Sequence, residues 1–351
     1  MDRFWRKFFK NKGAVAGLAI IICALLMAVF AYYIAPDGSP NANRIIPEIA
    51  NRKPGFSIYF LQLKKRDVST GWLEKLINGA SDKYEFIPIT QYERSGDSII
   101  VLKYIDDGVT ERQSYNAKGQ TDDLLITKKT FHLGTDKFGR DIVSRLIIGV
   151  RVSIGVGIIA VVISLSIGIM LGALAGYFKG WVDDVIMWFI NIIWSIPTLL
   201  LVFAITIVLG KGFWQVFMAV GLTMWVNVAR LVRGQVLAVR ELEYVDAARV
   251  LGFSNARIIT RHILPNILGP VLVIAAGNFA SAIVIEAGLS FLGVGVQPPQ
   301  PSWGLMIKEN YNFIITNNPM LALAPGIAIM LLVLAFNLLG NGLRDALSVR
   351  V

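Results

Sequence analysis

Few residues of this sequence combine in a way that could support covalent chemistry. His132 and Asp136 suggest an acid–base pair, but nothing near them supplies a nucleophile or a third partner. The chain has two histidines, a single cysteine (Cys23) and no HExxH or CxxC sequence, so a zinc or metalloprotease site is unsupported. We therefore expect no catalytic residue and no bound metal.

Phosphate binding on this chain is also unsupported. The sequence contains no G-x-x-x-x-G-K-[ST] stretch, whose backbone amides and lysine hold ATP phosphates in a P-loop. If the protein performs ATP-driven work, ATP and Mg²⁺ bind to another polypeptide. No cofactor is expected here.

The composition places the chain in a membrane. Its 351 residues are 55% hydrophobic and 17% charged, whereas soluble domains carry about 25% charged residues. A helix needs about 20 apolar residues to cross roughly 30 Å of hydrocarbon. Six runs are long enough, at about 14–34, 150–177, 185–209, 214–236, 266–289 and 320–341. We expect six spans, with only a very short turn between the third and the fourth.

The basic residues indicate topology rather than nucleic-acid binding, although the formal net charge is +10. They gather before the first run, around the connection between the fourth and fifth runs, and after the last run: Arg3, Arg6, Lys7, Lys10, Lys12, Arg230, Arg233, Arg240, Arg249, Arg257, Arg261, Arg344 and Arg350. With six spans all three groups fall on one side, which the positive-inside rule makes cytoplasmic. The first run exceeds the roughly 7–15 apolar residues of a signal peptide, so an uncleaved anchor with a cytoplasmic N-terminus is expected in the inner membrane.

Residues 36–131, between the first two runs, have a different composition. Positions 36–130 carry 14 Lys or Arg and 13 Asp or Glu. The stretches YEFIPITQY, SIIVLKYIDDG and LLITKKTF are rich in β-branched and aromatic residues and predict strands. TGWLEKLING predicts a short helix that ends at Gly79. We expect a small α+β domain that faces outward and serves packing or docking rather than chemistry.

One charged segment, EYVDAARVLGFSNARIITRHILP (243–265), interrupts the apolar sequence. Gly252 predicts the end of a helix that begins near Glu243, Ser254 predicts the cap of a second helix, and Pro265 suits the first turn of the next span. The small side chains of Ala247 and Ala248 would let a partner approach closely. The residues alone leave two interpretations open, a helix pair that contacts a partner and an interfacial helix on the lipid headgroups.

This segment resembles the EAA signature of the permease subunits of ABC importers. The motif positions are Asp246, Ala247, Ala248, Gly252, His262, Leu264 and Pro265, with Asp in place of Glu and His in place of Ile. In that family the segment is a coupling helix, here 243–262, that docks into a cleft of the cytoplasmic ATPase. The resemblance implies these contact residues: Glu243, Tyr244, Asp246, Ala247, Ala248, Arg249 and Gly252.

Two further stretches are similar to motifs of dipeptide, oligopeptide and nickel permeases. HLGTDKFGRDIVSRLIIGVRVSIGVG (132–157) matches an L-G-T-D-x-x-G-R-D motif at Leu133, Gly134, Thr135, Asp136, Gly139, Arg140 and Asp141. EAGLSFLGVGVQPPQPSWG (286–304) matches a motif that leads into a re-entrant outer helix. From the residues alone, Arg140, Arg145 and Arg151 are expected at the outer interface. Glu286, roughly 30 Å along the fifth span, is expected to anchor that end or to pair with an outer-side arginine.

Several polar residues lie within the predicted spans. The candidates for lining a translocation path are Asn191, Ser195, Asn227, Asn278 and Ser281. Asn and Ser also join helices to one another, so lining a path and holding helices together both stay open for each of them. Pro197 predicts a kink in the third span.

These features predict an all-α polytopic membrane protein with about six transmembrane helices of the ABC type I importer permease fold and a small α+β extracytoplasmic insertion. The expected domains are 1–35 with the first span, the insertion 36–131, and the core permease domain 132–351 with five spans. The resemblance implies the C-type permease of a peptide importer that works by alternating access. The implied partners are a second homologous permease, two ABC ATPase subunits that bind ATP and Mg²⁺, an extracytoplasmic substrate-binding protein and membrane lipid, with no nucleic acid.

Other functions stay open at this point. Nickel or another small solute would use a similar scaffold. An ABC-coupled mechanotransmitter or exporter would relay force through its outer domain but have fewer later spans. A membrane sensor would use the outer domain to bind a ligand and would not need the coupling segment.

Overall fold

The structure is a computed structural model that describes residues 2–65, 70–95, 98–116, 124–210, 212–315 and 318–347. The chain divides into two compact units. The first, called here the helical unit, comprises Met1–Leu25, Ser153–Gln297 and Ala328–Val351. The second, the insertion unit, comprises Leu26–Val152 and Pro298–Ile327. The insertion unit contains the expected insertion 36–131 together with residues on both sides of it and Pro298–Ile327, while the expected domain bounds stay a prediction.

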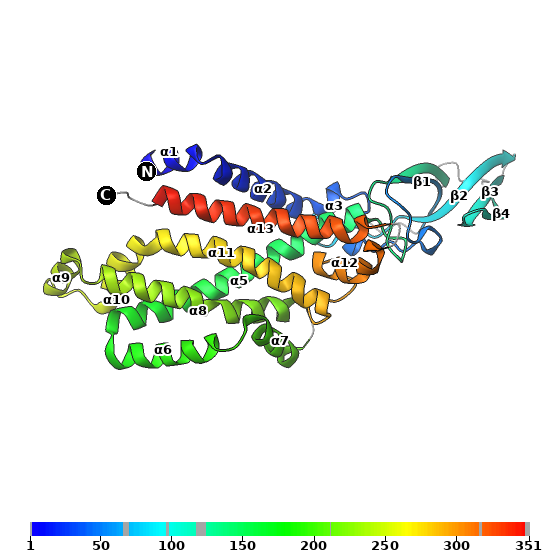
Figure 1. Cartoon of the computed structure of the whole chain (residues 1–351). Helices are drawn as coiled ribbons and strands as arrows, with labels where there is room; N and C mark the ends of the chain where they lie inside the picture. The colour runs from blue at the N-terminus through cyan, green and yellow to red at the C-terminus, as the bar shows by residue number, and fades with distance from the viewer. Residues whose placement is uncertain are drawn as a thin grey trace. The chain divides into compact units, whose positions relative to one another are not determined.

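Within the described residues, five helices are long and apolar enough to cross a membrane (Figure 1). They are α2 (Lys12–Val29), α5 (Ile142–Phe178), α8 (Phe213–Val239), α10 with α11 (Asn255–Leu292), and α13 (Met320–Leu347). The pair α6 (Gly180–Trp194) and α7 (Thr198–Leu209) passes the same test when its two helices are taken together, which gives up to six spans. The predicted polytopic helical fold is confirmed.

The third predicted span is broken rather than kinked. Helices α6 and α7 meet at an angle of 90°, with Ser195, Ile196 and Pro197 between them. Proline has no backbone N–H, and its ring disfavours helical geometry at the residue before it. The expectation of a kink at Pro197 understated the bend, because the two helices meet at a right angle.

The remaining helices are short. They are α1 (Asp2–Lys10), α3 (Ala31–Ile34), α4 (Trp72–Asn78), α9 (Glu243–Val250), α12 (Trp303–Asn310), 3₁₀ turns at Pro40–Ala42, Pro47–Ile49 and Tyr311–Ile314, and a π-helical stretch at Ile258–Ile263. Helix α4 ends at Gly79, whose φ is +83°, as TGWLEKLING predicted. The π-helical stretch joins α10 (Asn255–Arg257) to α11 (Leu264–Leu292), so the second predicted cytoplasmic helix runs directly into the next span.

Helix α8 forms the interior of the helical unit, since 67% of its most apolar window is buried, against 28–39% for the other spans. It packs against α7 and α11. Helix α5 approaches α8 along Gly168, Gly172 and Gly176, which are spaced by four residues and lie on one helix face. A Cβ atom at Gly172 would lie 2.5 Å from the Ala229 carbonyl oxygen. Glycine is therefore required for these two backbones to meet this closely.

The insertion unit contains a five-stranded antiparallel sheet in the order β4-β3-β2-β1-β5. The strands are β1 (Phe56–Lys64), β2 (Tyr84–Ser95), β3 (Ser98–Asp106), β4 (Val109–Asn116) and β5 (Leu124–Phe131). The three predicted strands correspond to β2, β3 and β5. Phe60 and Leu61 of β1 are adjacent, point to opposite faces and are both fully buried, each within a separate apolar cluster. The predicted α+β insertion is confirmed as part of the fold.

Candidate functional site

Helix α9 has the local structure that its sequence predicts. It covers Glu243–Val250, and Gly252 follows with φ +75°, a conformation that glycine adopts without a Cβ penalty. The Ser254 hydroxyl accepts a hydrogen bond from the Arg257 amide at 3.4 Å and caps α10. Pro265 lies in the first turn of α11. The segment therefore forms a projecting connection between α8 and α11 (Figure 1).

One face of α9 is buried in the interior of the protein. Val245 is fully buried and Ala248 is 3% exposed. Both belong to an apolar cluster with Val228, Val232 and Val236 of α8 and with Ile258, Ile263, Ile267 and Val271 on the α11 side. The expectation that Ala248 lets a partner approach closely is therefore wrong for this conformation. Its small side chain instead lets α9 pack against its own support.

The opposite face of α9 is exposed and of mixed character. Ala247 is exposed, and Arg249 donates to Asp246 at 2.7 Å across one turn. Val250 is 87% exposed and Leu251 is 71% exposed, and both lie at the tip of the turn. An apolar tip beside a charged helix face suits docking into a cleft of a partner protein.

Two more predicted contact residues lie at the start of α9. Glu243 is exposed. Tyr244 is 41% exposed, and its hydroxyl accepts a hydrogen bond from Asn266 Nδ2 at 3.0 Å and donates to the His262 carbonyl oxygen at 3.4 Å. Tyr244 therefore fixes α9 to α11 while part of its ring stays accessible.

Three of the five candidate path residues line one cavity. Asn227 of α8 and Asn278 and Ser281 of α11 surround a volume of about 210 Å³. The other lining residues are Ile193, Trp194, Ile196, Thr198, Leu201, Thr223, Met224, Val226 and Ile285. The broken α6–α7 pair forms the other side, and the Asn278 amide donates to Ser164 Oγ at 3.4 Å. The cavity thus presents neutral amide and hydroxyl groups on apolar walls.

The other two candidates lie outside that lining. Asn191 Oδ1 accepts a hydrogen bond from Arg230 Nη2 at 2.7 Å, and the Arg230 guanidinium lies 3.7 Å from the Trp194 ring centre. The Ser195 hydroxyl donates to the Ile192 carbonyl oxygen at 2.7 Å. Asn191 therefore joins α6 to α8, which is the helix-joining alternative that the sequence left open.

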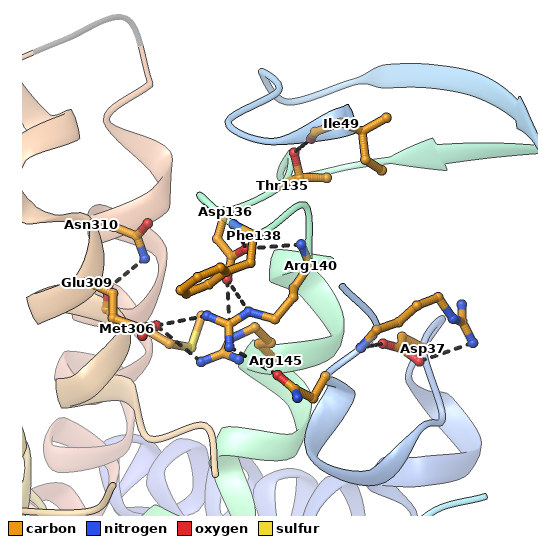
Figure 2. Close-up of polar contacts among 12 residues, drawn as sticks. Asp37, Ile49, Thr135, Asp136, Phe138, Arg140, Arg145, Met306, Glu309 and Asn310 are labelled. Carbon is orange, nitrogen blue, oxygen red and sulfur yellow. Dashed lines mark hydrogen bonds and ion pairs between the residues drawn. The ribbon is translucent and has the colours of Figure 1, made fainter. Parts of the chain in front are cut away.

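The L-G-T-D-x-x-G-R-D motif forms a buried ionic cluster in the insertion unit, as Figure 2 shows. Arg140 Nε donates to Asp136 at 2.6 Å, and Arg140 Nη2 donates to Glu309 of α12 at 3.0 Å. Arg145 donates to the same Glu309 oxygen at 3.4 Å and lies 3.8 Å from Asp136. The side chains of Arg140, Arg145 and Asp136 are 4%, 1% and 1% exposed. The expectation that Arg140 and Arg145 sit at an interface is wrong, since two carboxylates hold them inside the protein.

Backbone contacts complete this motif. Asp136 Oδ1 accepts hydrogen bonds from the amides of Phe138 and Arg140 at 2.9 and 3.0 Å. The Asp141 carboxylate accepts hydrogen bonds from the Ser144 amide at 2.9 Å and from the Ser144 hydroxyl. Burial raises the pKa of Asp141, and these two hydrogen bonds oppose that shift. Thr135 accepts from the Arg52 amide at 2.9 Å and donates to the Ile49 carbonyl oxygen. The motif therefore ties the insertion to the start of α5.

The glycines of this motif serve the same junction. Gly134 has φ +80° and Gly139 has φ +73°. A Cβ atom at either position would collide with the backbone of the segment from Ile46 to Lys53. The turn that carries Asp136 can therefore lie directly against the insertion.

Neither His132 nor Glu286 forms a reactive centre in the described residues. His132 is exposed, while the Asp136 carboxylate is engaged by Arg140. Glu286 is fully buried in α11 and accepts a hydrogen bond from Ser290 Oγ at 2.7 Å. Ser290 Oγ in turn accepts from the Val296 amide at 3.0 Å. Glu286 therefore supports the turn that follows α11 from inside the protein, and its expected role as an interfacial anchor or arginine partner stays a prediction.

Sequence reasoning missed three features of the site. The Gly168, Gly172 and Gly176 stripe was detectable from its four-residue spacing. Val250 and Leu251, two apolar residues directly before a helix-ending glycine, were detectable as an exposed tip. Glu309 carried no comparable signal, because its partners lie more than 160 residues earlier in the chain.

Comparisons with known proteins agree on one family. The family model described as "Binding-protein-dependent transport system inner membrane component" matches residues 168–351, and the model described as "N-terminal TM domain of oligopeptide transport permease C" matches residues 1–54.

Three curated relatives illustrate the match. The glutathione transport system permease protein GsiD of Pectobacterium atrosepticum is 42% identical over 216 residues, which cover 62% of this chain and 71% of the relative. The dipeptide transport system permease protein DppC of Alkalihalophilus pseudofirmus is 43% identical over 215 residues, covering 61% and 70%. The oligopeptide transport system permease protein OppC of Bacillus subtilis is 37% identical over 250 residues, covering 71% and 82%. The spans, the projecting α9 connection and these matches agree, and the chain belongs to the family of inner membrane permease components of binding-protein-dependent ABC transport systems.

Proposed function

We propose that this chain is the C-type permease subunit of an ABC importer that moves peptides across the cytoplasmic membrane by alternating access. The relatives named for dipeptide, oligopeptide and glutathione transport support a peptide substrate. The amide and hydroxyl groups of the cavity also suit a peptide backbone, which both donates and accepts hydrogen bonds.

One observation carries the mechanism: the helices that support α9 also line the cavity. Val228 of α8 packs in the cluster beneath α9, and its neighbour Asn227 faces the cavity. On α11, Ile267 and Val271 belong to the same cluster, and Asn278 lies about two turns further along. A force applied to the exposed tip of α9 would therefore move both polar walls of the cavity.

The cavity size requires such movement. Its volume of about 210 Å³ is below the roughly 300–1,000 Å³ of ordinary small-molecule sites. A peptide passes only if the broken α6–α7 pair, α8 and α11 separate. ATP binding and hydrolysis on separate ATPase subunits supply the energy, and this chain performs no catalysis.

The proposed assembly contains a second homologous permease, two ABC ATPase subunits with ATP and Mg²⁺, and an extracytoplasmic binding protein. We propose that the N-terminus and α9 face the cytoplasm, which the distribution of the basic residues supports through the positive-inside rule. The insertion is proposed to contact the binding protein or the second permease.

The test is ATP-dependent uptake of a radiolabelled dipeptide into proteoliposomes that contain the purified assembly, with unlabelled peptide or Ni²⁺ as competitor. Competition by peptide and not by Ni²⁺ supports the proposal, and the reverse pattern would assign a metal importer. Leu251→Glu should lower uptake and ATPase recovery by more than about tenfold, since an apolar contact at the centre of an interface contributes about 2 kcal/mol or more. Val109→Glu is the matched control, because Val109 is equally apolar, 53% exposed and located in β4. Full ATPase recovery with Leu251→Glu would refute the role of the α9 tip.

A further inference from the structure

Helix α4 of the insertion carries an apolar face that nothing in the described residues covers. Trp72 is 69% exposed, Leu73 is 53% exposed and Ile77 is 58% exposed. In the sequence WLEKLIN the apolar residues occupy positions 72, 73, 76 and 77, which form one stripe on a helix, while Glu74, Lys75 and Asn78 take the other positions.

The backbone of α4 is held against the end of the first span. The Tyr33 hydroxyl of α3 donates to the Trp72 carbonyl oxygen at 3.2 Å, and Lys75 Nζ lies 4.5 Å from the centre of the Tyr33 ring. At the other end of α4, Arg151 Nη1 of α5 donates to the Ile77 carbonyl oxygen at 2.8 Å. These contacts set the level of α4 relative to Tyr33 and Arg151.

The helix lengths place that level at a membrane surface. Helix α2 has 18 residues, or about 27 Å at 1.5 Å per residue, which is close to the roughly 30 Å thickness of the hydrocarbon layer. The residues that follow it, Phe30 to Ile34, then lie at the boundary between hydrocarbon and headgroups. Tyr33 is 47% exposed and Ile34 is 52% exposed there. Aromatic residues are enriched at this depth.

We propose that α4 is an interfacial helix that inserts Trp72, Leu73 and Ile77 into the bilayer surface on the insertion's side and so anchors the insertion to lipid. Lipid is the indicated occupant because Leu26, Val29 and Phe30, at the end of the first span, are also exposed and lead directly to Tyr33, which holds α4. The face also combines the residue types of an interfacial helix, with Trp, Leu and Ile on one side and Lys75 able to reach the headgroups. The inference concerns membrane attachment and does not depend on which substrate is transported.

The test uses nitroxide labels on single-cysteine variants of the full chain, assembled with cysteine-free partner subunits in phospholipid vesicles. Cys23→Ala removes the native thiol, and Trp72→Cys, Leu73→Cys and Ile77→Cys supply label sites one at a time. Val109→Cys, an exposed apolar residue on β4, is the control. Oxygen concentrates in lipid and a water-soluble nickel chelate does not, so we expect the ratio of the two accessibilities to be several-fold higher at 72, 73 and 77 than at 109.

Two results would overturn the proposal. A ratio equal to that at 109 means that α4 faces water, and shielding from both reagents means that a protein surface covers it. A second series keeps the label at 77 and changes residue 72. Trp72→Asp should lower the ratio at 77 to the value at 109, while Trp72→Tyr should preserve it. An unchanged ratio with Trp72→Asp would mean that α4 does not depend on lipid insertion.

Discussion

The buried ionic cluster at Asp136, Arg140, Arg145 and Glu309 allows a quantitative prediction. Replacing Asp136 with alanine removes the carboxylate that faces both arginines and accepts two backbone amides. Arg140 and Arg145 would stay buried and would still share the Glu309 carboxylate.

The expected cost follows from this burial. Breaking a buried ion pair by removing one partner destabilises a protein by about 3–5 kcal/mol, because the remaining charge stays away from water. Asp136→Asn should cost less than Asp136→Ala, since the amide oxygen can still accept from the Phe138 and Arg140 backbone. Asp246→Ala is the control, because its partner Arg249 is exposed and water screens such pairs.

The assay is unfolding of the purified chain in mixed micelles by increasing sodium dodecyl sulfate, followed by far-ultraviolet circular dichroism. Hydrogen–deuterium exchange of amides 133–145 then localises the change. We expect the order of stability to be Asp246→Ala, then Asp136→Asn, then Asp136→Ala, with faster exchange at 133–145 in the last two. If Asp136→Ala were as stable as Asp246→Ala, the cluster would contribute nothing and the reasoning would be refuted.

Three further predictions follow from individual contacts. Gly172→Ala should lower the melting temperature, because the added Cβ atom would meet the Ala229 carbonyl oxygen. Gly234→Ala should leave it unchanged, because no atom lies within 4 Å of the added Cβ there. Equal melting temperatures of the two variants would exclude a close α5–α8 contact. Asn278→Leu should reduce dipeptide uptake while the ATPase still copurifies, and undiminished uptake would remove Asn278 from the path. Burial and repulsion from Arg44 lower the pKa of Lys129 from 10.5 to about 8 in the folded protein. The Lys129 amine therefore binds a proton more strongly in the unfolded chain than in the folded one. The wild type should therefore gain stability relative to Lys129→Met as pH rises from 8 to 10.5, and a difference that is constant with pH would contradict this.

The sequence predicted those features that depend on short stretches of chain. The spans follow from apolar runs of sufficient length, and the ends of α4 and α9 follow from Gly79 and Gly252. Strands β2, β3 and β5 follow from β-branched and aromatic residues. Strands β1 and β4 were not predicted. Strand β4 (VTERQSYN) is an edge strand, which can be polar and then lacks the apolar alternation that identifies a strand.

The candidate site shows the same division. The sequence showed that Asn227, Asn278 and Ser281 lie in spans. It did not show that they meet around one cavity or that Asn191 lies outside it, because both depend on how α6, α8 and α11 pack. The acidic residue, alanines and glycine of the α9 motif were evident, but which alanine faces inward was not. The rotation of α9 is set by the apolar cluster beneath it, and Ala248 rather than Ala247 fills that space.

By itself, then, the sequence determined the membrane class, the position of the long apolar helices, the presence of an α+β insertion and the helix-breaking positions. Local sterics, hydrogen bonding and the thickness of the bilayer decide these features within a few residues. Only the tertiary structure decided that Arg140 and Arg145 are buried rather than interfacial. Their charges are tolerated inside because Glu309, more than 160 residues later, is brought beside Asp136. A buried charge is stable only with its partner in place, and packing alone brings that partner there.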